Sequence, residues 1–427
     1  MLDWTDEHKM LRDAIRSFVE KEIVPLRDEL EHGDLAPYGV LRKMFASFGI
    51  DEMARDSFKK RLERDAAMGT TSGEVLPEAL TETVTDSSVS GFDPALMLIL
   101  LIELSRHCPG MVTALGVSAG LTASAIDSRG TLRQRERWVP DLLTLDRIGA
   151  WALTEPGAGS DAFGAMRASA RRDGDDYILN GSKTFITNGP YADTIVFICK
   201  LDDGSPLEER KIVSFVLDSG MPGLEQSRPL RKMGMHSSPT GEIFVSDLRA
   251  GVDRLIGETE DAPTDARHGA KGTFATERAA VAAMALGIID RCLSLCVAYA
   301  NDRVQFGRPI GEFQLIQDKL ARMEIARLNV SNLVFRHIEA INDNRPLTLA
   351  EASAMKLYSS RAATEVALEA VQLFGGNGYM AEFGIEQLAR DAKALQIYGG
   401  TDEMQITHIA KDLLGGFPNG RRVGVGA

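Results

Sequence analysis

The chain has 427 residues, of which 44% are hydrophobic and 26% are charged, and this length leaves room for about two to four domains. Its formal net charge of −13 excludes a surface built mainly to bind nucleic acid or anionic membranes. An anionic ligand therefore has to be met by a local pocket. No run of 18 consecutive apolar residues is present, so no membrane span is expected. The first helix lacks the features of a signal peptide, and a cytoplasmic location is expected.

Residues 1–148 carry mostly helical patterns and are predicted to form an N-terminal helical domain. An amphipathic helix opens this domain, and a polar segment at 69–91 interrupts it as a loop or partly ordered insert. The four cysteines lack metal-ligand spacing, apart from one pair a helical turn apart, and are typical of core thiols: Cys108, Cys199, Cys292 and Cys296.

Between 149 and 262 the pattern changes to short β-type runs, which predicts a middle β domain. The runs YIL and KTFIT flank Asn180-Gly181, a dipeptide typical of a β-hairpin turn. The runs TIVFIC, KIVSFVL and EIFVSD follow them. A polar linker at 257–272 is expected to end the domain.

Long helical patterns resume in the third domain, 263–427. The helix expected over 277–300 is apolar on nearly all sides and should lie centrally in a bundle. A further helix is expected over 349–374, because Thr348 and Glu351 match a capping box and two glycines follow its end. The chain is thus predicted to be mainly α, with a β module packed against two helical layers.

The most informative motif is WALTEPGAGSD at 151–161, followed by FITNG at 185–189. Pro156 and the glycines at 157 and 159 make a rigid loop whose backbone N–H groups can face a ligand, and nearby hydroxyl groups can do the same. Taken alone, such a loop is most often a plain turn, and it matches neither a Walker A loop nor a G-x-G-x-x-G fingerprint.

Four further segments give the pattern its specificity: RKMGMHSSPTGEIFVSD, RVQFGRPIGEFQLIQ, QLFGGNGY and IYGGT, at 231–247, 303–317, 372–379 and 397–401. Together with LTEPGAGSD, they closely resemble the acyl-CoA dehydrogenase family. The resemblance covers about residues 100–415 and the first helix. It implies a helical domain, a β-barrel-like middle domain and a four-helix bundle, assembled as a homotetramer with FAD between the second and third domains.

Matching positions imply which residues serve the ligands. The expected FAD contacts are Trp151, Leu153, Thr154, Gly159, Ser160, Phe185, Ile186, Thr187, Arg303, Gln305, Phe306, Phe313, Gln314, Gln372, Leu373, Gly375, Gly376, Thr401 and Glu403, some of them across a subunit interface. An arginine fork and bare glycine amides suit a pyrophosphate in an acidic protein. The expected contacts with the acyl-CoA substrate are Ser160, Phe274, Arg278, Gly399, Gly400 and Lys411.

The catalytic base is expected at Glu277. Dehydrogenation of an acyl thioester needs a carboxylate to take the α proton while the flavin accepts a hydride from Cβ. Most family members carry that glutamate in a Y-E-G-T motif, where this chain has Gly399. A subset that includes the isovaleryl-CoA and long-chain acyl-CoA dehydrogenases places it in an E-R pair, which Glu277 and Arg278 match. Asp402 and Glu403 are the rival bases, and a first-turn carboxylate that stabilises the helix dipole is the structural alternative for Glu277.

Three other functions stay open beside an acyl-CoA dehydrogenase that passes electrons to an electron-transfer flavoprotein. The first two are an acyl-CoA oxidase and a flavin monooxygenase on the same fold; the retained Glu277 disfavours the monooxygenase. The third is a non-catalytic subunit that binds FAD or CoA. Residues 50–92 depart from the family pattern, so the length of the acyl chain is not predicted.

Overall fold

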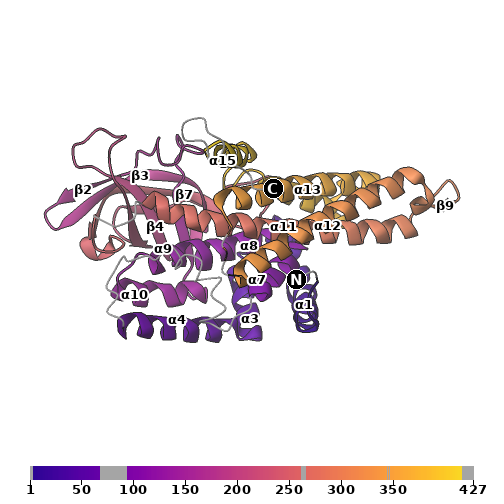
Figure 1. Ribbon diagram of the computed structural model, residues 1–427, viewed down its shortest axis with the longest axis horizontal. Coiled ribbons are helices and arrows are strands. Elements are labelled where there is room, and N and C mark those ends of the chain that lie inside the picture. Colours follow the sequence, from indigo (N-terminus) through magenta and orange to yellow (C-terminus); the bar gives the residue numbers. More distant parts are fainter. Residues whose placement is uncertain (1–2, 68–93, 261–265, 344, 346, 416–427) are drawn as a thin grey trace, which may run out of the picture.

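The computed structural model describes backbone and side chains for residues 3–67, 95–260, 277–343, 345 and 347–415, and the backbone alone for 94 and 266–276. Figure 1 shows a β-sheet at one end, N-terminal helices beneath it, and long C-terminal helices that run to the far end of the molecule. The order of helical domain, sheet and second helical domain confirms the predicted fold class. The predicted polar insert at 69–91 lies outside the described residues.

The N-terminal domain is a layer of helices that contributes to one large apolar core. Its first helix begins after Thr5, whose side chain and that of His8 form a reciprocal cap. The helices are α1 (Asp6–Phe18), α2 (Arg27–His32), α3 (Tyr38–Phe48), α4 (Ile50–Ala67), α7 (Pro94–Ser105), α8 (Pro109–Leu115), α9 (Ala123–Asp127) and α10 (Leu132–Leu143).

The middle domain is a seven-stranded sheet in which the long strands β3 and β7 pair antiparallel. One edge of β4 is shared by β1 and β2, both parallel to it, and the other edge pairs with β5. The strands are β1 (Gly149–Ala152), β2 (Ser169–Asp173), β3 (Asp176–Thr187), β4 (Thr194–Leu201), β5 (Ile212–Asp218), β6 (Leu224–Gln226) and β7 (Thr240–Gly251).

The predicted hairpin at Asn180-Gly181 is wrong, because YIL and KTFIT are two parts of one strand, β3. The register with β7 shifts between Leu179 and Gly181, so the dipeptide makes an irregularity within the strand. A Cβ at Gly181 would lie 2.6 Å from the Cβ of Ala168, which shows that close approach requires the glycine. The chain reverses instead at Gly174, between β2 and β3.

The C-terminal domain is built around α11 (Ala266–Asp302), which packs against α7, α12 and α13. This helix begins at Ala266, before the predicted start at 277, so part of the predicted 257–272 linker is helical. Gly269 and Gly272 lower the helix propensity of that stretch, which is why its sequence does not predict the start of the helix. The remaining elements are β8 (Val304–Gln305), β9 (Arg308–Pro309), α12 (Gln314–Asn342), α13 (Leu349–Phe374), α14 (Ile385–Ala394) and α15 (Asp402–Gly415).

Two helical stretches are long and apolar enough to cross a membrane by length and composition, Pro109–Asp127 and Glu277–Asp302. In each, 61% of the most apolar window is buried inside the molecule. Both contribute to the central apolar core, and core helices of soluble proteins pass the same test. All four cysteines are buried and unpaired, which confirms their prediction as core thiols.

Candidate active site

The carboxylate of Glu277 lies directly against Gly399, although the two residues are far apart in the sequence. A Cβ built on Gly399 would lie 3.2 Å from Oε1 of Glu277 and 3.7 Å from Oε2. Glu277 is half-buried and lies in the fourth turn of α11, which begins at Ala266. The alternative of a first-turn carboxylate that stabilises the helix dipole is therefore wrong for this residue.

Burial and charge act on Glu277 in opposite directions. Burial raises the pKa of its carboxyl group above the ordinary value, and the cationic groups of Arg278 and Lys356 pull it back down. Arg278 is itself buried, and its Nη1 donates to Oγ of Ser353 on α13 at 3.0 Å. A carboxylate with a raised pKa is a stronger base than an exposed one, which suits proton abstraction near neutral pH.

The Gly399–Gly400 turn joins α14 to α15 in a conformation that favours glycine at both positions, with φ of +61° and +85°. Its carbonyl groups are held from within the protein. Nε2 of Gln405 donates to the carbonyl oxygens of Gly399 at 3.0 Å and Gly400 at 2.7 Å, and Nζ of Lys356 donates to that of Gly400 at 2.7 Å. These hydrogen bonds fix the backbone of the turn, and the Cα of Gly399, which carries no side chain, faces the carboxylate of Glu277.

The rival bases are engaged elsewhere. Oδ2 of Asp402 accepts from Nε of Arg361 at 2.8 Å, and its Oδ1 accepts from Ser360 at 3.5 Å. Glu403 is exposed, and hydrogen bonds from its own backbone N–H and from Thr401 lower its pKa. A low pKa makes a carboxylate a weak base.

A buried ion pair shapes the loop of the LTEPGAGSD motif. Lys183 on β3 is fully buried, and its Nζ donates to Oε1 of Glu155 and to the carbonyl oxygen of Leu153, both at 2.9 Å. The carboxylate of Glu155 also accepts from the backbone N–H groups of Arg167 at 2.7 Å and Ala168 at 2.9 Å. Because these interactions anchor Glu155 and Leu153 at the start of the loop, the exposed Gly159 and Ser160 further along it have a defined position.

The FITNG motif contains a β-bulge that turns one aromatic side chain outward. The register of β3 with β7 shifts between Lys183 and Ile186, and Phe185 has a φ of +57° with a side chain that is 70% exposed. Asn188, which we did not predict as a site residue, fixes the end of the motif. Its Nδ2 donates to the carbonyl oxygens of Ala114 and Gly149 at 2.9 Å each.

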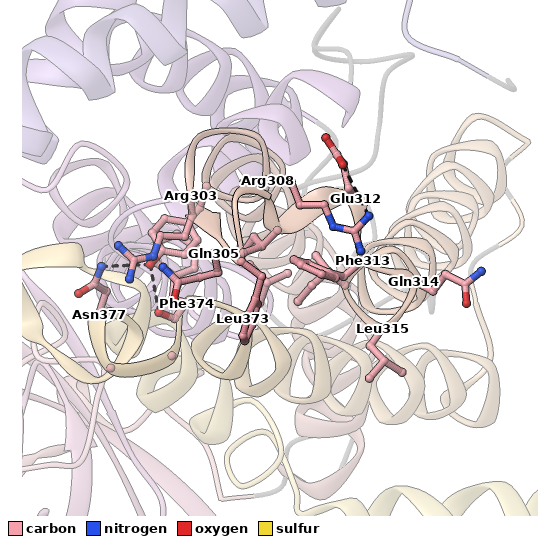
Figure 2. Close-up of a pocket in the computed structure, with 16 residues that line it drawn as sticks. Arg303, Gln305, Arg308, Glu312, Phe313, Gln314, Leu315, Leu373, Phe374 and Asn377 are labelled. Atoms are coloured by element: carbon pink, nitrogen blue, oxygen red, sulfur yellow. Dashed lines mark hydrogen bonds and ion pairs between the residues drawn. The ribbon is translucent and has the colours of Figure 1, made fainter.

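A second part of the expected cofactor site is a cavity of about 980 Å³ at the C-terminal ends of α11 and α13. Figure 2 shows Arg303 near Asn377 and Phe374 at one side and Gln314 pointing away at the other. The rings of Phe374 and Tyr299 stack at 4.0 Å, and the hydroxyl of Tyr299 accepts from Nδ2 of Asn377 at 3.0 Å. Of the predicted residues, this cavity brings together Arg303, Gln305, Phe306, Phe313, Gln314, Leu373, Gly375 and Gly376.

The donors around this cavity suit a dinucleotide. Arg303 and Gln305 are exposed hydrogen-bond donors, and a Cβ at Gly375 or Gly376 would meet nothing within 4 Å. A ligand can therefore approach the bare backbone at this turn. The side chain of Phe306 is 94% exposed and offers an apolar surface beside it. Guanidinium and backbone N–H groups match pyrophosphate oxygens, and the aromatic groups match an adenine ring.

Several predicted residues lie away from these surfaces or contribute little side chain to them. The side chains of Leu153 and Ile186 lie in the core, so only their backbones can face a ligand. Lys411 is exposed on α15, and Gln372 is exposed on α13. Trp151, Thr154, Thr187 and Thr401 are half-buried. The side chain of Phe274 lies outside the described residues.

A helical domain, a sheet and a second helical domain, with a half-buried carboxylate against a glycine turn and a cavity lined by Arg303 and two glycines, are the arrangement expected of an oxidoreductase that acts on acyl thioesters with FAD. Family models for the acyl-CoA dehydrogenase N-terminal, middle and C-terminal domains match residues 5–78 with 85–146, 150–248 and 268–414. The chain belongs to the acyl-CoA dehydrogenase family, whose members depend on FAD.

Relatives match along almost the whole chain. An acyl-CoA dehydrogenase of Bacillus subtilis is 34% identical over 96% of this chain and 99% of its own length. A 3-(aryl)acrylate reductase of Clostridium sporogenes is 33% identical over 96% and 99%. The solved structure of butyryl-CoA dehydrogenase from Megasphaera elsdenii is 30% identical, covers 97% of this chain and 100% of its own, and superposes with a TM-score of 0.80.

Proposed function

We propose that this chain converts an acyl-CoA thioester to the trans-2-enoyl-CoA, with Glu277 as the α-proton base. The Cα–H bond breaks as its proton passes to the carboxylate of Glu277. The Cβ–H bond breaks as a hydride leaves, and the two carbons form the double bond. Bound FAD supplies the hydride acceptor. Protein groups at the thioester carbonyl would stabilise the negative charge that develops there.

The contact between Glu277 and Gly399 carries this proposal. A base on the Gly399 turn and a base on α11 would compete for one space, because a side chain at 399 would start 3.2 Å from the carboxylate of Glu277. Glycine at 399 leaves that space to Glu277. The raised pKa of Glu277 supports the same assignment.

The residues that would hold FAD fall into two groups on one chain. Phe185 and the 154–160 loop are on the sheet, and the Arg303 cavity is at the end of α11. Glu277 lies on α11, and Arg303 follows directly after the end of this helix, 26 positions later. At a rise of 1.5 Å per residue, the two residues are about 40 Å apart. One dinucleotide is shorter than this span. We therefore propose that a second copy of the chain completes each FAD site, within a homotetramer, and that the Arg303 cavity receives the FAD of a neighbour.

Stopped-flow spectroscopy of flavin reduction tests the base. Glu277→Gln should keep FAD but reduce its flavin about 10²–10⁴-fold more slowly with butyryl-, isovaleryl-, octanoyl- and palmitoyl-CoA. Asp402→Asn and Glu403→Gln are the matched controls, since each removes one carboxylate charge near the turn. Loss of reduction in a control, with Glu277→Gln still active, would overturn the assignment.

The electron acceptor is tested on the same preparations. We propose an electron-transfer flavoprotein as the partner that reoxidises the enzyme, and the reduced protein should then reoxidise much faster with that partner than with oxygen. Fast reoxidation by oxygen alone would instead make the chain an acyl-CoA oxidase.

A further inference from the structure

A stripe of buried polar side chains runs along α13, which the sequence analysis did not single out. Ser353, Lys356 and Ser360 are each fully buried and lie on one face of the helix, three and four residues apart. Ser353 accepts from Arg278, Lys356 donates to the carbonyl of Gly400, and Ser360 donates to Asp402 at 3.5 Å. One helix face thus contacts the neighbour of the proposed base, the glycine turn and the start of α15.

Lys356 is the member of this stripe that needs an explanation. Burying an ammonium group is costly, and a hydrogen bond to a carbonyl does not require a charge. The carbonyl of Gly400 already accepts from Nε2 of Gln405 at 2.7 Å. The hydrogen bond alone therefore does not account for a buried ammonium group at this position.

The charged groups around Lys356 show where that charge acts. Three carboxylates act on it, Asp402 most strongly, then Glu277 on α11 and Glu403 on α15, and the cation Arg278 opposes them. Asp402 is already paired with Arg361, and Glu403 is exposed. Glu277 is the one that combines burial with a proposed role in the reaction. Burial lowers the pKa of Lys356 to about 8, so its amine is still mainly protonated at neutral pH.

We propose that Lys356 is a positioning residue for the dehydrogenation, which fixes the Gly399–Gly400 turn against Glu277 and, together with Arg278, supplies positive charge that favours the ionised form of this half-buried carboxylate. The proposal rests on the proposed role of Glu277 as the base. Nζ of Lys356 lies 2.7 Å from the Gly400 carbonyl oxygen, and the adjoining Gly399 contacts the carboxylate of Glu277. Arg278, the other cation that acts on Glu277, donates to Ser353 on the same stripe.

Replacing Lys356 by Met tests this proposal, with Gln405→Met as the matched control. Both variants remove a donor to the Gly400 carbonyl, but only Lys356→Met removes a charge. We expect Lys356→Met to slow flavin reduction at pH 7 and to move the acid limb of its pH–rate profile upward by on the order of 1 unit, because a lost positive neighbour makes ionisation harder. Gln405→Met should slow reduction without moving the limb. Equal limbs in Lys356→Met and the wild type would overturn the proposal.

Two further measurements keep the result decisive. FAD content and melting temperature report whether each variant folds, and Lys356→Gln, which keeps a donor but no charge, should shift the limb as Lys356→Met does. If both Lys356 variants lose FAD or fail to fold while Gln405→Met folds, Lys356 serves stability alone and the proposal is wrong. Glu277→Gln, run in parallel, separates the two claims. Active Glu277→Gln refutes the base, whereas inactive Glu277→Gln with an unmoved Lys356→Met limb refutes only the role of Lys356.

Discussion

Restoring a glutamate at position 399 should set two carboxylates against each other in one pocket. The Cβ of Gly399→Glu would start 3.2 Å from Oε1 of Glu277, so we expect the new carboxylate to share the pocket of the existing one. The new side chain also has to adopt a φ of +61°, which costs about 1–2 kcal/mol of stability for a residue other than glycine. Gly399→Gln carries the same strain and bulk without the charge, and it is the matched control.

The expected shift follows from Coulomb's law. Two unit charges 4 Å apart repel by about 4 kcal/mol at an effective dielectric constant of 20, which corresponds to about 3 pKa units at 1.36 kcal/mol per unit. Arg278 and Lys356 offset part of this repulsion because both cations act on the same carboxylate. We therefore expect the apparent pKa of the pair to rise by about 1–2 units.

The sign of the effect is fixed by the role of a base. A base accepts a proton only when it is ionised, so a higher pKa moves the acid limb of flavin reduction to higher pH. Below the limb, the rate falls about tenfold for each pH unit. Stopped-flow reduction between pH 5 and 9 measures this for the wild type, Gly399→Glu and Gly399→Gln. An acid limb that is the same in all three proteins would refute the placement of residue 399 beside the base.

Two further predictions concern stability and assembly. Lys183→Met should lower the free energy of unfolding by about 3–5 kcal/mol, because it leaves the buried carboxylate of Glu155 without its cationic partner. Thermal unfolding measures this loss, and adding Glu155→Gln should recover part of it. A melting temperature equal to that of the wild type would show that the pair is not buried. A hetero-oligomer of Glu277→Gln and Arg303→Ala chains can be purified through two different tags, and it should regain acyl-CoA dehydrogenation that neither variant has alone. The reason is that one site per pair would combine an intact Glu277 with the intact Arg303 of the other chain. No recovery in the mixed oligomer would place both residues in one chain's site.

The fold and the contact between Glu277 and the Gly399 turn could be predicted because their signals are local or paired. The cap formed by Thr348 and Glu351 marks the start of α13, and the structure has the helix over the predicted residues. The glycine at 399 and the glutamate at 277 are each uninformative alone. Their joint occurrence predicts a shared space, and the structure brings the two together.

The remaining features depend on contacts that no local pattern encodes. Asn180-Gly181 has the composition of a turn, but pairing along the whole length of β7 keeps the strand continuous. Lys356 looks like a surface residue of an amphipathic helix, but α13 packs against α11, and Nζ of Lys356 contacts the carbonyl of Gly400 in the glycine turn. Asn188 shows the same limit, since its partners Ala114 and Gly149 come from other elements.

The paired glycines at 399 and 400 serve two needs at once, and these needs are connected. Their positive φ values direct the chain into α15, which begins at Asp402. Their missing side chains also let the backbone approach Glu277. A carboxylate on a turn has to be held by its neighbours, whereas one in the fourth turn of a long buried helix is positioned by that helix. If Glu277 on α11 is the base, as we propose, the turn needs only to stay clear of its carboxylate, and the hydrogen bonds from Lys356 and Gln405 to the turn carbonyls hold it there.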